Sequence, residues 1–117
     1  MSDSFYFVLE VSILPGQLEN FRAVSRDLIA AMQLESGTLN YEWNLSHDEN
    51  SCHIYERYRD SAAFMAHAQT FGKFAERFLE TCYPVCIDVY GSPSEEAQAA
   101  LAGFHPTYYS PLGGFSR

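Results

Sequence analysis

Basic residues are scarce in this sequence. Seven lysines and arginines stand against 15 acidic residues, which gives a formal charge of −8 over 117 residues. Binding to nucleic acid needs a basic stripe that neutralises phosphates, whereas the few basic side chains here are scattered along the chain. An anionic membrane surface would repel so acidic a protein. We therefore expect neither nucleic-acid nor membrane partners.

Long hydrophobic segments and an even set of cysteines are also missing. The longest apolar run, Phe5 to Leu9, has about five residues, whereas a membrane-spanning helix needs ~20. The first residues lack the positive charge of a signal peptide. Three cysteines, an odd number without an export signal, argue against a disulfide framework. These absences predict a cytoplasmic protein with free, buried cysteines.

Motifs for metals and nucleotide cofactors are absent as well. The histidines have no metal-ligand spacing with one another or with cysteine. No H-E-x-x-H, Walker or Rossmann glycine pattern occurs. We therefore expect no metal and no other bound cofactor.

Aromatic residues, in contrast, are abundant. The chain has nine Phe, eight Tyr and one Trp, which is more than the core of a single domain of this length usually needs. Some of these rings are therefore expected to line a pocket or an interface.

The pattern of apolar residues predicts an α+β fold. Strands are predicted over residues 5–13, 38–46, 52–59 and 82–90, and helices over residues 17–34 and 61–69, with a break near residue 72. This β-α-β-β-α-β order is that of the ferredoxin-like fold, which has a four-stranded antiparallel sheet with helices on one face. The bare face carries apolar side chains that a second sheet would cover, so we expect a homodimer.

Two turns have more specific expectations. Gly37 follows the first helix and suits a left-handed conformation there. Ser92, Pro93 and Glu95 match the N-cap, first and third positions of a C-terminal helix that runs to Ala102.

The end of the chain has aromatic residues but no periodicity. Residues 104–117 contain four aromatic residues, two prolines and two glycines, a composition that argues against both a regular helix and a free tail. We expect an ordered arm that docks on its own domain or on the partner. Residues 1–91 would then form the ferredoxin-like part, and residues 92–117 the C-terminal helix and docking arm of the same domain.

Four short motifs occur in order along the chain. They are Leu14-Pro15-Gly16, Glu35-Ser36-Gly37-Thr38-Leu39-Asn40-Tyr41, Ile54-Tyr55-Glu56-Arg57-Tyr58 and Phe64-Met65-Ala66-His67. Through these motifs, residues 5–90 resemble the antibiotic biosynthesis monooxygenase domain family. The resemblance implies a dimeric α/β barrel with a substrate cavity between the sheet and the helices of each subunit. It also implies a range of activities that includes cofactor-free oxygenases of quinols and polyphenols, haem-degrading enzymes and isomerases.

The sequence departs from the two well-understood sites of that family. Quinone-forming members have an Asn and a Trp on the third strand and a Tyr at the start of the second helix, where this chain has Ile54, Tyr58 and Phe64. Their strand-two histidine is replaced by Asn44, and the strand-one Asn of haem-degrading members by Leu9. Neither site is therefore carried over.

The pattern that remains of the resemblance centres on Tyr41, Glu56 and His67. A cofactor-free oxygenase has to deprotonate a phenol in a dry pocket, and a histidine has the ordinary pKa for that task. His67 shares the apolar face of its helix with Phe64 and Phe71, so we predict it as the base, with Glu56 orienting the imidazole. The structural alternative is a core histidine that only hydrogen-bonds Glu56.

The predicted substrate-binding residues are Tyr41, Trp43, Asn44, Tyr55, Tyr58 and Phe64. Tyrosine hydroxyls would donate to a quinone oxygen, and the indole of Trp43 would stack on a flat ring; the alternative for these rings is packing in the core or interface. The sequence leaves open whether Tyr41 and Trp43 or the alternate residues of that strand face the helices.

These observations predict a cofactor-free monooxygenase that oxidises a small aromatic quinol or polyphenol with molecular oxygen. Two alternatives remain. The first is a dimer that binds a small aromatic metabolite without turnover. The second is an isomerase or decarboxylase that uses the same pocket for proton transfer without oxygen.

Overall fold

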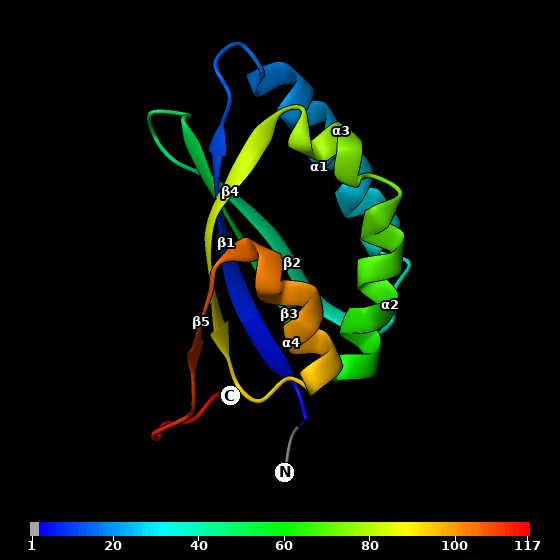
Figure 1. Cartoon of the computed structure of the whole chain (residues 1–117), viewed down its shortest axis with the longest axis vertical. Helices are drawn as coiled ribbons and strands as arrows, with labels where there is room; N and C mark the ends of the chain where they lie inside the picture. Colours follow the sequence, from blue (N-terminus) through cyan, green and yellow to red (C-terminus); the bar gives the residue numbers. More distant parts are fainter. Residues whose placement is uncertain (1–2) are drawn as a thin grey trace.

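One mixed β-sheet, backed on one side by helices, makes up the domain (Figure 1). The computed structural model describes residues 3–117. Its strands are β1 (Phe5–Ile13), β2 (Thr38–Leu45), β3 (Ser51–Tyr58), β4 (Cys82–Tyr90) and β5 (Pro106–Tyr109), in the sheet order β2-β3-β1-β4-β5. The helices are α1 (Leu18–Met32), α2 (Ser61–Gly72), α3 (Ala75–Leu79), α4 (Glu95–Leu101) and the short 3₁₀ turn η1 (Ala102–Phe104).

The predicted α+β ferredoxin-like order is confirmed, with one addition to the sheet. The four predicted strands pair antiparallel, but β5 adds a fifth strand that runs parallel to β4. The prolines of the C-terminal segment argue against a central strand, and β5 lies at the edge of the sheet. Pro106 is nevertheless tolerated because it opens a strand at the sheet edge, where a missing N–H breaks no central ladder.

The core lies between the inner face of the sheet and the helices. Alternate residues of β1, beginning at Phe5 and ending at Val11, are buried against apolar positions of α1 such as Val24 and Leu28. Val85 departs from the predicted alternation of β4 and is 40% exposed. The register between β1 and β4 shifts between Glu10 and Val11, which leaves Val85 as the extra residue of a bulge.

The outer face of the sheet carries a row of tyrosines from four strands. Tyr90 stacks on Tyr6 with ring centroids 4.8 Å apart, and on Tyr109 at 5.1 Å. Tyr55 meets Tyr6 edge-on at 5.6 Å. We call Tyr55, Tyr6, Tyr90 and Tyr109 the tyrosine row. No helix of the domain covers it (Figure 1).

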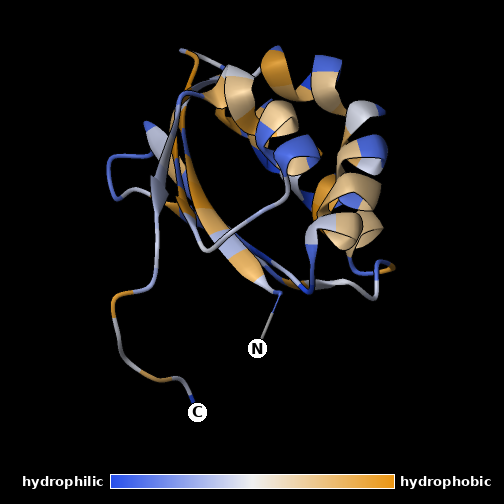
Figure 2. Cartoon of the chain, turned by 60° about the horizontal axis from the view of Figure 1, so that its bottom comes forward, coloured by the Kyte–Doolittle hydropathy of each residue, from blue (hydrophilic) through white to orange (hydrophobic). Residues whose placement is uncertain are grey.

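The C-terminal segment docks only in part. Phe104 packs against the core and the next residues form β5, so the expected contact with the chain's own domain is present. After Tyr109, Ser110, Pro111 and Gly113 still line a hollow with Tyr6 and Tyr90 on the outer face of the sheet. The end of the chain then leaves the domain (Figure 2), and Leu112 and Phe115 are exposed.

Helix α4 begins two residues later than predicted. Ser94, not Ser92, is the N-cap: its backbone is extended and its hydroxyl accepts a hydrogen bond from the Ala97 N–H at 3.2 Å. The backbone N–H of Ser94 donates to the hydroxyl of Ser61 at 2.9 Å, which ties the start of α4 to the start of α2.

Gly37 is required for a close approach rather than for a left-handed turn, as its φ lies outside that region. A Cβ at this position would lie 2.5 Å from the Cβ of Ala63 in α2. When a Cβ lies closer than about 3.0 Å to another heavy atom, one of the two has to move. Gly37 therefore allows the turn before β2 to pack against the first turn of α2. That turn also carries Glu35.

The substitution Gly37→Ala is expected to destabilise the fold by about 1–3 kcal/mol, because the new methyl group overpacks against Ala63. Chemical denaturation measures the change. Gly72→Ala, at the end of α2 with nothing within 4 Å of its added Cβ, is the matched control and should cost no stability. The double variant Gly37→Ala/Ala63→Gly should recover part of the loss; equal stability of Gly37→Ala and wild type would contradict the close-approach argument.

Candidate active site

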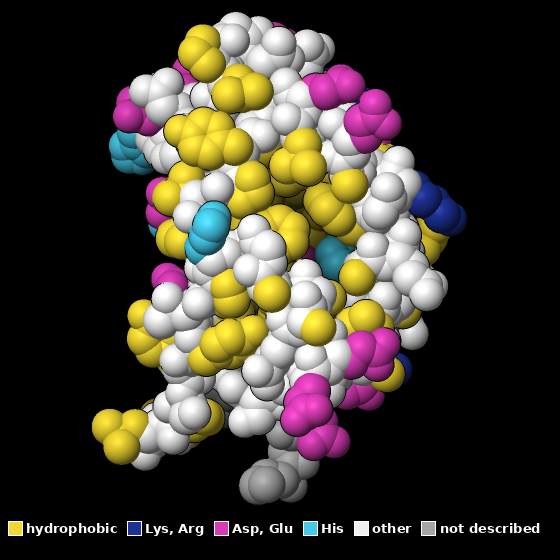
Figure 3. Space-filling model, viewed as in Figure 1, with side chains coloured by type: hydrophobic (Ala, Val, Ile, Leu, Met, Phe, Trp, Pro, Cys, Tyr) yellow, Lys and Arg dark blue, Asp and Glu magenta, His cyan; other side chains and the backbone are white. Residues whose placement is uncertain are grey.

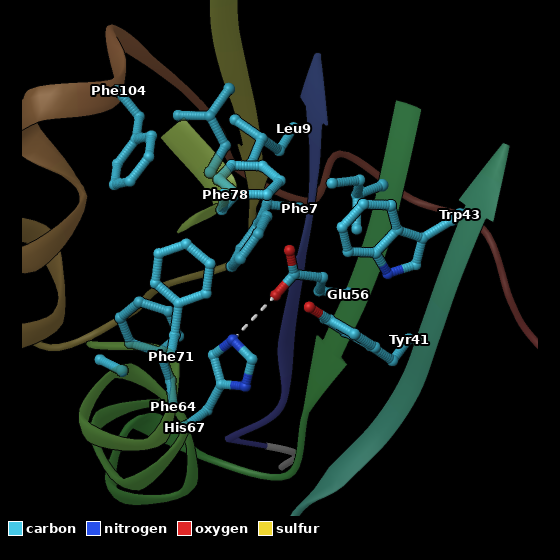
Figure 4. Close-up of a pocket in the computed structure, with 13 residues that line it drawn as sticks. Phe7, Leu9, Tyr41, Trp43, Glu56, Phe64, His67, Phe71, Phe78 and Phe104 are labelled. Carbon is cyan, nitrogen blue, oxygen red and sulfur yellow. Dashed lines mark ion pairs between the residues drawn. The ribbon is translucent and has the colours of Figure 1, made fainter. Parts of the chain in front are cut away.

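A cavity lies between the inner face of the sheet and helices α2 and α3 (Figure 4). Most of its wall is aromatic, and the rings come from Phe7, Phe64, Phe71, Phe78 and Phe104. Its volume is about 60 Å³. On the surface it is seen as a hollow ringed by hydrophobic side chains (Figure 3). The cavity is therefore apolar except at one point.

That point is a buried cluster of one histidine and two glutamates. Nε2 of His67 lies 3.3 Å from Oε1 of Glu56, and Nδ1 lies 3.2 Å from Oε1 of Glu35. The side chains of His67 and Glu56 are each 6% exposed, and that of Glu35 is 17% exposed. Both ring nitrogens thus face a carboxylate, one on each side of the imidazole.

Neighbouring hydroxyl groups hold both carboxylates in place. The Tyr58 hydroxyl donates to Oε1 of Glu56 at 2.5 Å, and the Thr38 hydroxyl donates to Oε1 of Glu35 at 2.9 Å. No side chain of residues 3–117 donates a hydrogen bond to the other oxygen of Glu56, Oε2, which points into the cavity in Figure 4. Oε2 is therefore the carboxylate oxygen that a bound molecule can reach.

The pKa of His67 reflects two opposing effects. Burial among the aromatic rings lowers it, but the hydrogen bond and charge of Glu56, followed by those of Glu35, outweigh burial and leave the pKa above its ordinary value. The two carboxylates therefore favour the cationic form of the imidazole, which has one ring nitrogen beside each of them.

The tyrosines of the cluster remain protonated. Burial first, and then the charge of Glu56, raise the pKa of both Tyr41 and Tyr58 well above the ordinary value. The hydroxyl of Tyr41 points toward Glu56 in Figure 4. It is thus available as a hydrogen-bond donor and not as a base.

Trp43 adds a second donor on the wall formed by β2. Its indole N–H is buried and has no acceptor among the described residues, although Tyr41 lies edge-on to the ring at 5.9 Å. A buried donor without a partner costs about 1–3 kcal/mol. A ligand oxygen that reached this N–H would recover that cost.

The structure brings together five of the predicted site residues, and settles which face of β2 meets the helices. Tyr41, Trp43, Glu56, Phe64 and His67 all line the cavity. The alternate residues of β2 are on the outer face of the sheet.

Three other predicted residues lie elsewhere. Tyr58 does not line the cavity; it lies behind the wall, where its hydroxyl donates to Glu56 and its ring contacts His67 at 5.1 Å. Asn44 and Tyr55 are on the outer face of the sheet, because side chains alternate along a strand. The Asn44 amide donates to the backbone carbonyls of Glu42 and His53 at 3.4 Å. Neither Asn44 nor Tyr55 lines this cavity.

Sequence reasoning missed Glu35 and Phe104. Glu35 belongs to the second of the four motifs, but its contact with His67 spans 32 residues of sequence and depends on how the turn before β2 meets α2. Phe104 lies in a segment without periodicity. Its only signal was the aromatic content of the C-terminal end.

Residues 3–117 contain no group of three or more His, Cys, Asp or Glu side chains placed to hold a metal ion. Within the same residues, no helix combines the length and hydropathy needed to cross a membrane.

A family model for antibiotic biosynthesis monooxygenases matches residues 4–81. The chain belongs to this family. A comparison with curated protein sequences found no match.

Solved structures show the same fold. MupZ from Pseudomonas fluorescens has a TM-score of 0.86 at 22% identity, over 97% of this chain and 94% of that chain. PA3566 from Pseudomonas aeruginosa has a TM-score of 0.70 at 27% identity, over 80% and 98%. SnoaB, a cofactor-independent oxygenase from Streptomyces nogalater, has a TM-score of 0.68 at 17% identity, over 80% and 96%. The match to MupZ thus extends over nearly the whole chain, beyond the family domain.

The charge of His67 gives a test through stability. Because its folded-state pKa is raised, the stabilisation from its protonation is fully present below the unfolded-state pKa of ~6.5 and is lost as the pH rises through the folded-state pKa. His67→Gln is therefore expected to cost on the order of 3 kcal/mol at pH 6, and less at pH 9. Denaturant unfolding at several pH values measures this difference.

His53→Gln is the matched control, because His53 lies 3.2 Å from Glu10 in a pair whose side chains are 56% and 37% exposed. Exposed pairs contribute little, so this variant should match the wild type at every pH. A cost of His67→Gln that stays constant between pH 6 and pH 9 would mean that His67 is not held as a cation.

Proposed function

We propose that this chain is a cofactor-independent monooxygenase that oxidises a small phenol or quinol with molecular oxygen. The observation that carries the proposal is Oε2 of Glu56, a carboxylate oxygen that has no hydrogen-bond donor among residues 3–117 and faces an aromatic cavity beside His67. A carboxylate in that position accepts a proton, and the adjacent cation stabilises the anion that the substrate becomes.

The proposed roles differ from the sequence prediction in one respect. His67 was predicted as the base, but each of its ring nitrogens faces a carboxylate and neither is open to a substrate. Glu56 is therefore the proposed base, through Oε2, and His67 the proposed electrostatic partner. Tyr41 and Trp43 supply donors on the β2 wall for a second oxygen of the substrate.

The reaction balances without an added reductant. Glu56 takes the phenol proton, and the phenolate gives one electron to oxygen. The two radicals combine at a ring carbon, and the peroxide oxygen takes back the proton to give a hydroperoxide. Loss of the ring hydrogen and cleavage of the O–O bond then release water. A phenol and O₂ thus become a quinone and one water, and each product receives one of the two atoms of O₂.

The charge and size of the site define the substrate class. Two carboxylates and one imidazolium leave a net negative charge, which disfavours carboxylate substrates and favours neutral phenols. An apolar cavity of ~150 Å³ accepts benzene, whereas this one has about 60 Å³. A ring enters only when aromatic side chains at the mouth move outward, which favours one ring over several fused rings.

Oxygen uptake with a panel of hydroquinones and phenols tests the proposal. Glu56→Gln should lower kcat by ~10²-fold or more, since the amide cannot accept the proton. Glu42→Gln, which removes an exposed carboxylate from the outer face of β2, is the matched control and should retain wild-type activity. Trp43 is the only tryptophan, so its fluorescence reports binding at the cavity directly.

Each alternative function gives a different result in the same assay. Quenching of Trp43 fluorescence without turnover would replace the enzyme by a binder of small aromatic metabolites. Turnover that persists under nitrogen would point to an isomerase or decarboxylase. Full activity of Glu56→Gln would remove Glu56 from the chemistry.

We also infer that the protein is a homodimer, with the outer sheet faces of two copies in contact. The tyrosine row and Val8 form a largely aromatic surface that no helix of the domain covers, although the guanidinium of Arg57 lies over the Tyr6 ring at 5.1 Å. Sheets pack well face to face. The resemblance to the family supports the same arrangement.

Val8→Lys tests the dimer. Val8 lies beside Asp88 across the strand pair, so a lysine there is tolerated in a single subunit but places a charge inside the proposed interface. Sedimentation at low micromolar concentration should show a dimer for the wild type and a folded monomer for the variant. Gln33→Lys, on the helical side, should remain dimeric. A monomeric wild type would refute the interface.

A further inference from the structure

The imidazole of His67 lies between two separate hollows, the aromatic cavity and a hollow on the surface. On the Nε2 side, Glu56 faces the aromatic cavity. On the Nδ1 side, Glu35 lines a different hollow on the surface, together with Gly37, Ala63 and Thr70. Glu35 therefore lies outside the cavity and does not touch a substrate there, yet it contacts the ring that supports the proposed base.

We propose that Glu35 is a positioning residue for the reaction: it accepts the Nδ1 proton of His67 from outside the cavity and so keeps the imidazole cationic, with its Nε2–H directed at Glu56. The kinetic part of this proposal rests on the proposed monooxygenase function. The part that concerns the charge of His67 does not.

The local structure fixes Glu35 in place. Its carboxylate accepts from the Thr38 hydroxyl at 2.9 Å, and its backbone carbonyl accepts from the Thr38 N–H at 3.2 Å. The Gly37 carbonyl accepts from the Arg59 N–H at 2.9 Å, which fastens the same turn to the end of β3. The close approach of Gly37 to Ala63 then presses this turn against α2, the helix that carries His67. Glu35 is thus held beside the ring from two sides.

The other groups around His67 do not replace Glu35. Glu56 and Tyr58 face the ring from β3, and Tyr41 faces it from β2. Both tyrosines are neutral, so the carboxylates are the two negative charges in contact with the ring. Without Glu35, a neutral imidazole with its proton on Nε2 would still donate to Glu56, and Nδ1 would need no proton. A single carboxylate therefore favours the cation less strongly than two.

The chemical consequence concerns the substrate anion. When Glu56 accepts the phenol proton, the negative charge moves to the substrate, and the nearest positive charge in the cavity wall is His67. A neutral imidazole would leave that anion in an apolar space without a counter-charge, which is costly. Glu35 would therefore act on kcat through His67, with little effect on KM for a neutral phenol.

Glu35→Gln is the decisive variant, because the amide oxygen still accepts from Nδ1–H but carries no charge. Nitrogen chemical shifts of the His67 ring, followed by NMR as a function of pH, should show the pKa of His67 falling below the wild-type value. In oxygen-uptake assays, kcat should fall increasingly as the pH rises, on the order of 10-fold at the alkaline end, with KM nearly unchanged. Glu35→Asp retains the charge, so its His67 pKa and its kcat should lie between those of the wild type and those of Glu35→Gln.

Glu10→Gln is the matched control, since Glu10 lies 3.2 Å from His53 as Glu35 does from His67, but in an exposed pair. It should leave the titration of His67 and the pH profile unchanged. A purely structural Glu35 would lower the melting temperature in Glu35→Gln without moving the His67 titration or the pH profile, and that result would overturn the proposal. Absence of turnover in the wild type would refute the monooxygenase function and leave the NMR result to decide the role of Glu35.

Discussion

The burial of His67 and Glu56 among aromatic rings, with Glu35 on the far side of the imidazole, is the constraint on which the rest of this structure depends. Isolated charges in such surroundings cost several kcal/mol each, and an ion pair offsets that cost only with good geometry and further hydrogen bonds. Here the imidazole of His67 meets a carboxylate on each side, and a hydroxyl group donates to each carboxylate. The cluster spans β3, α2 and the turn before β2, so its geometry requires all three in register.

The same constraint explains features that contribute nothing to the cavity wall. Tyr58 is fully buried and lines no part of the cavity, but its hydroxyl completes the hydrogen bonding of Glu56. Gly37 touches no member of the cluster, but it allows the turn that carries Glu35 to lie against α2. Tyr58 and Gly37 therefore do more than pack the core, because both help to hold the buried charges in a stable arrangement.

The periodicity of the sequence was sufficient to predict most of the fold, because each strand and helix buries one face. The periodicity did not predict two features that depend on backbone geometry. They are the bulge that exposes Val85 and the edge strand that begins with Pro106. His67 and Glu56 were predictable from a helix stripe and a strand motif. Glu35 was not, since its contact with His67 comes from the packing of a turn against a helix, which has no signature in local spacing.

The two faces of the sheet carry different side chains, because the side chains of β2 and β3 alternate between the faces. Tyr41 and Glu56 face inward, while Asn44 and Tyr55, predicted for the same pocket, face outward. A shift of either strand by one residue would exchange these sets and place the carboxylate outside the cavity. The register of the central strands therefore fixes the chemistry of the cavity and the surface offered to a partner at the same time.

The segment beyond the family domain links the cavity to the edge of the sheet. Phe104 closes one side of the cavity from η1, and the next residues turn through His105, which adopts a left-handed conformation, into β5. One ring of the cavity wall is thus carried by the segment that leads into an edge strand. The charged groups of the cluster come instead from β3, α2 and the turn before β2. The apolar wall therefore depends in part on the C-terminal segment, whereas the buried charge cluster depends only on residues within the family domain.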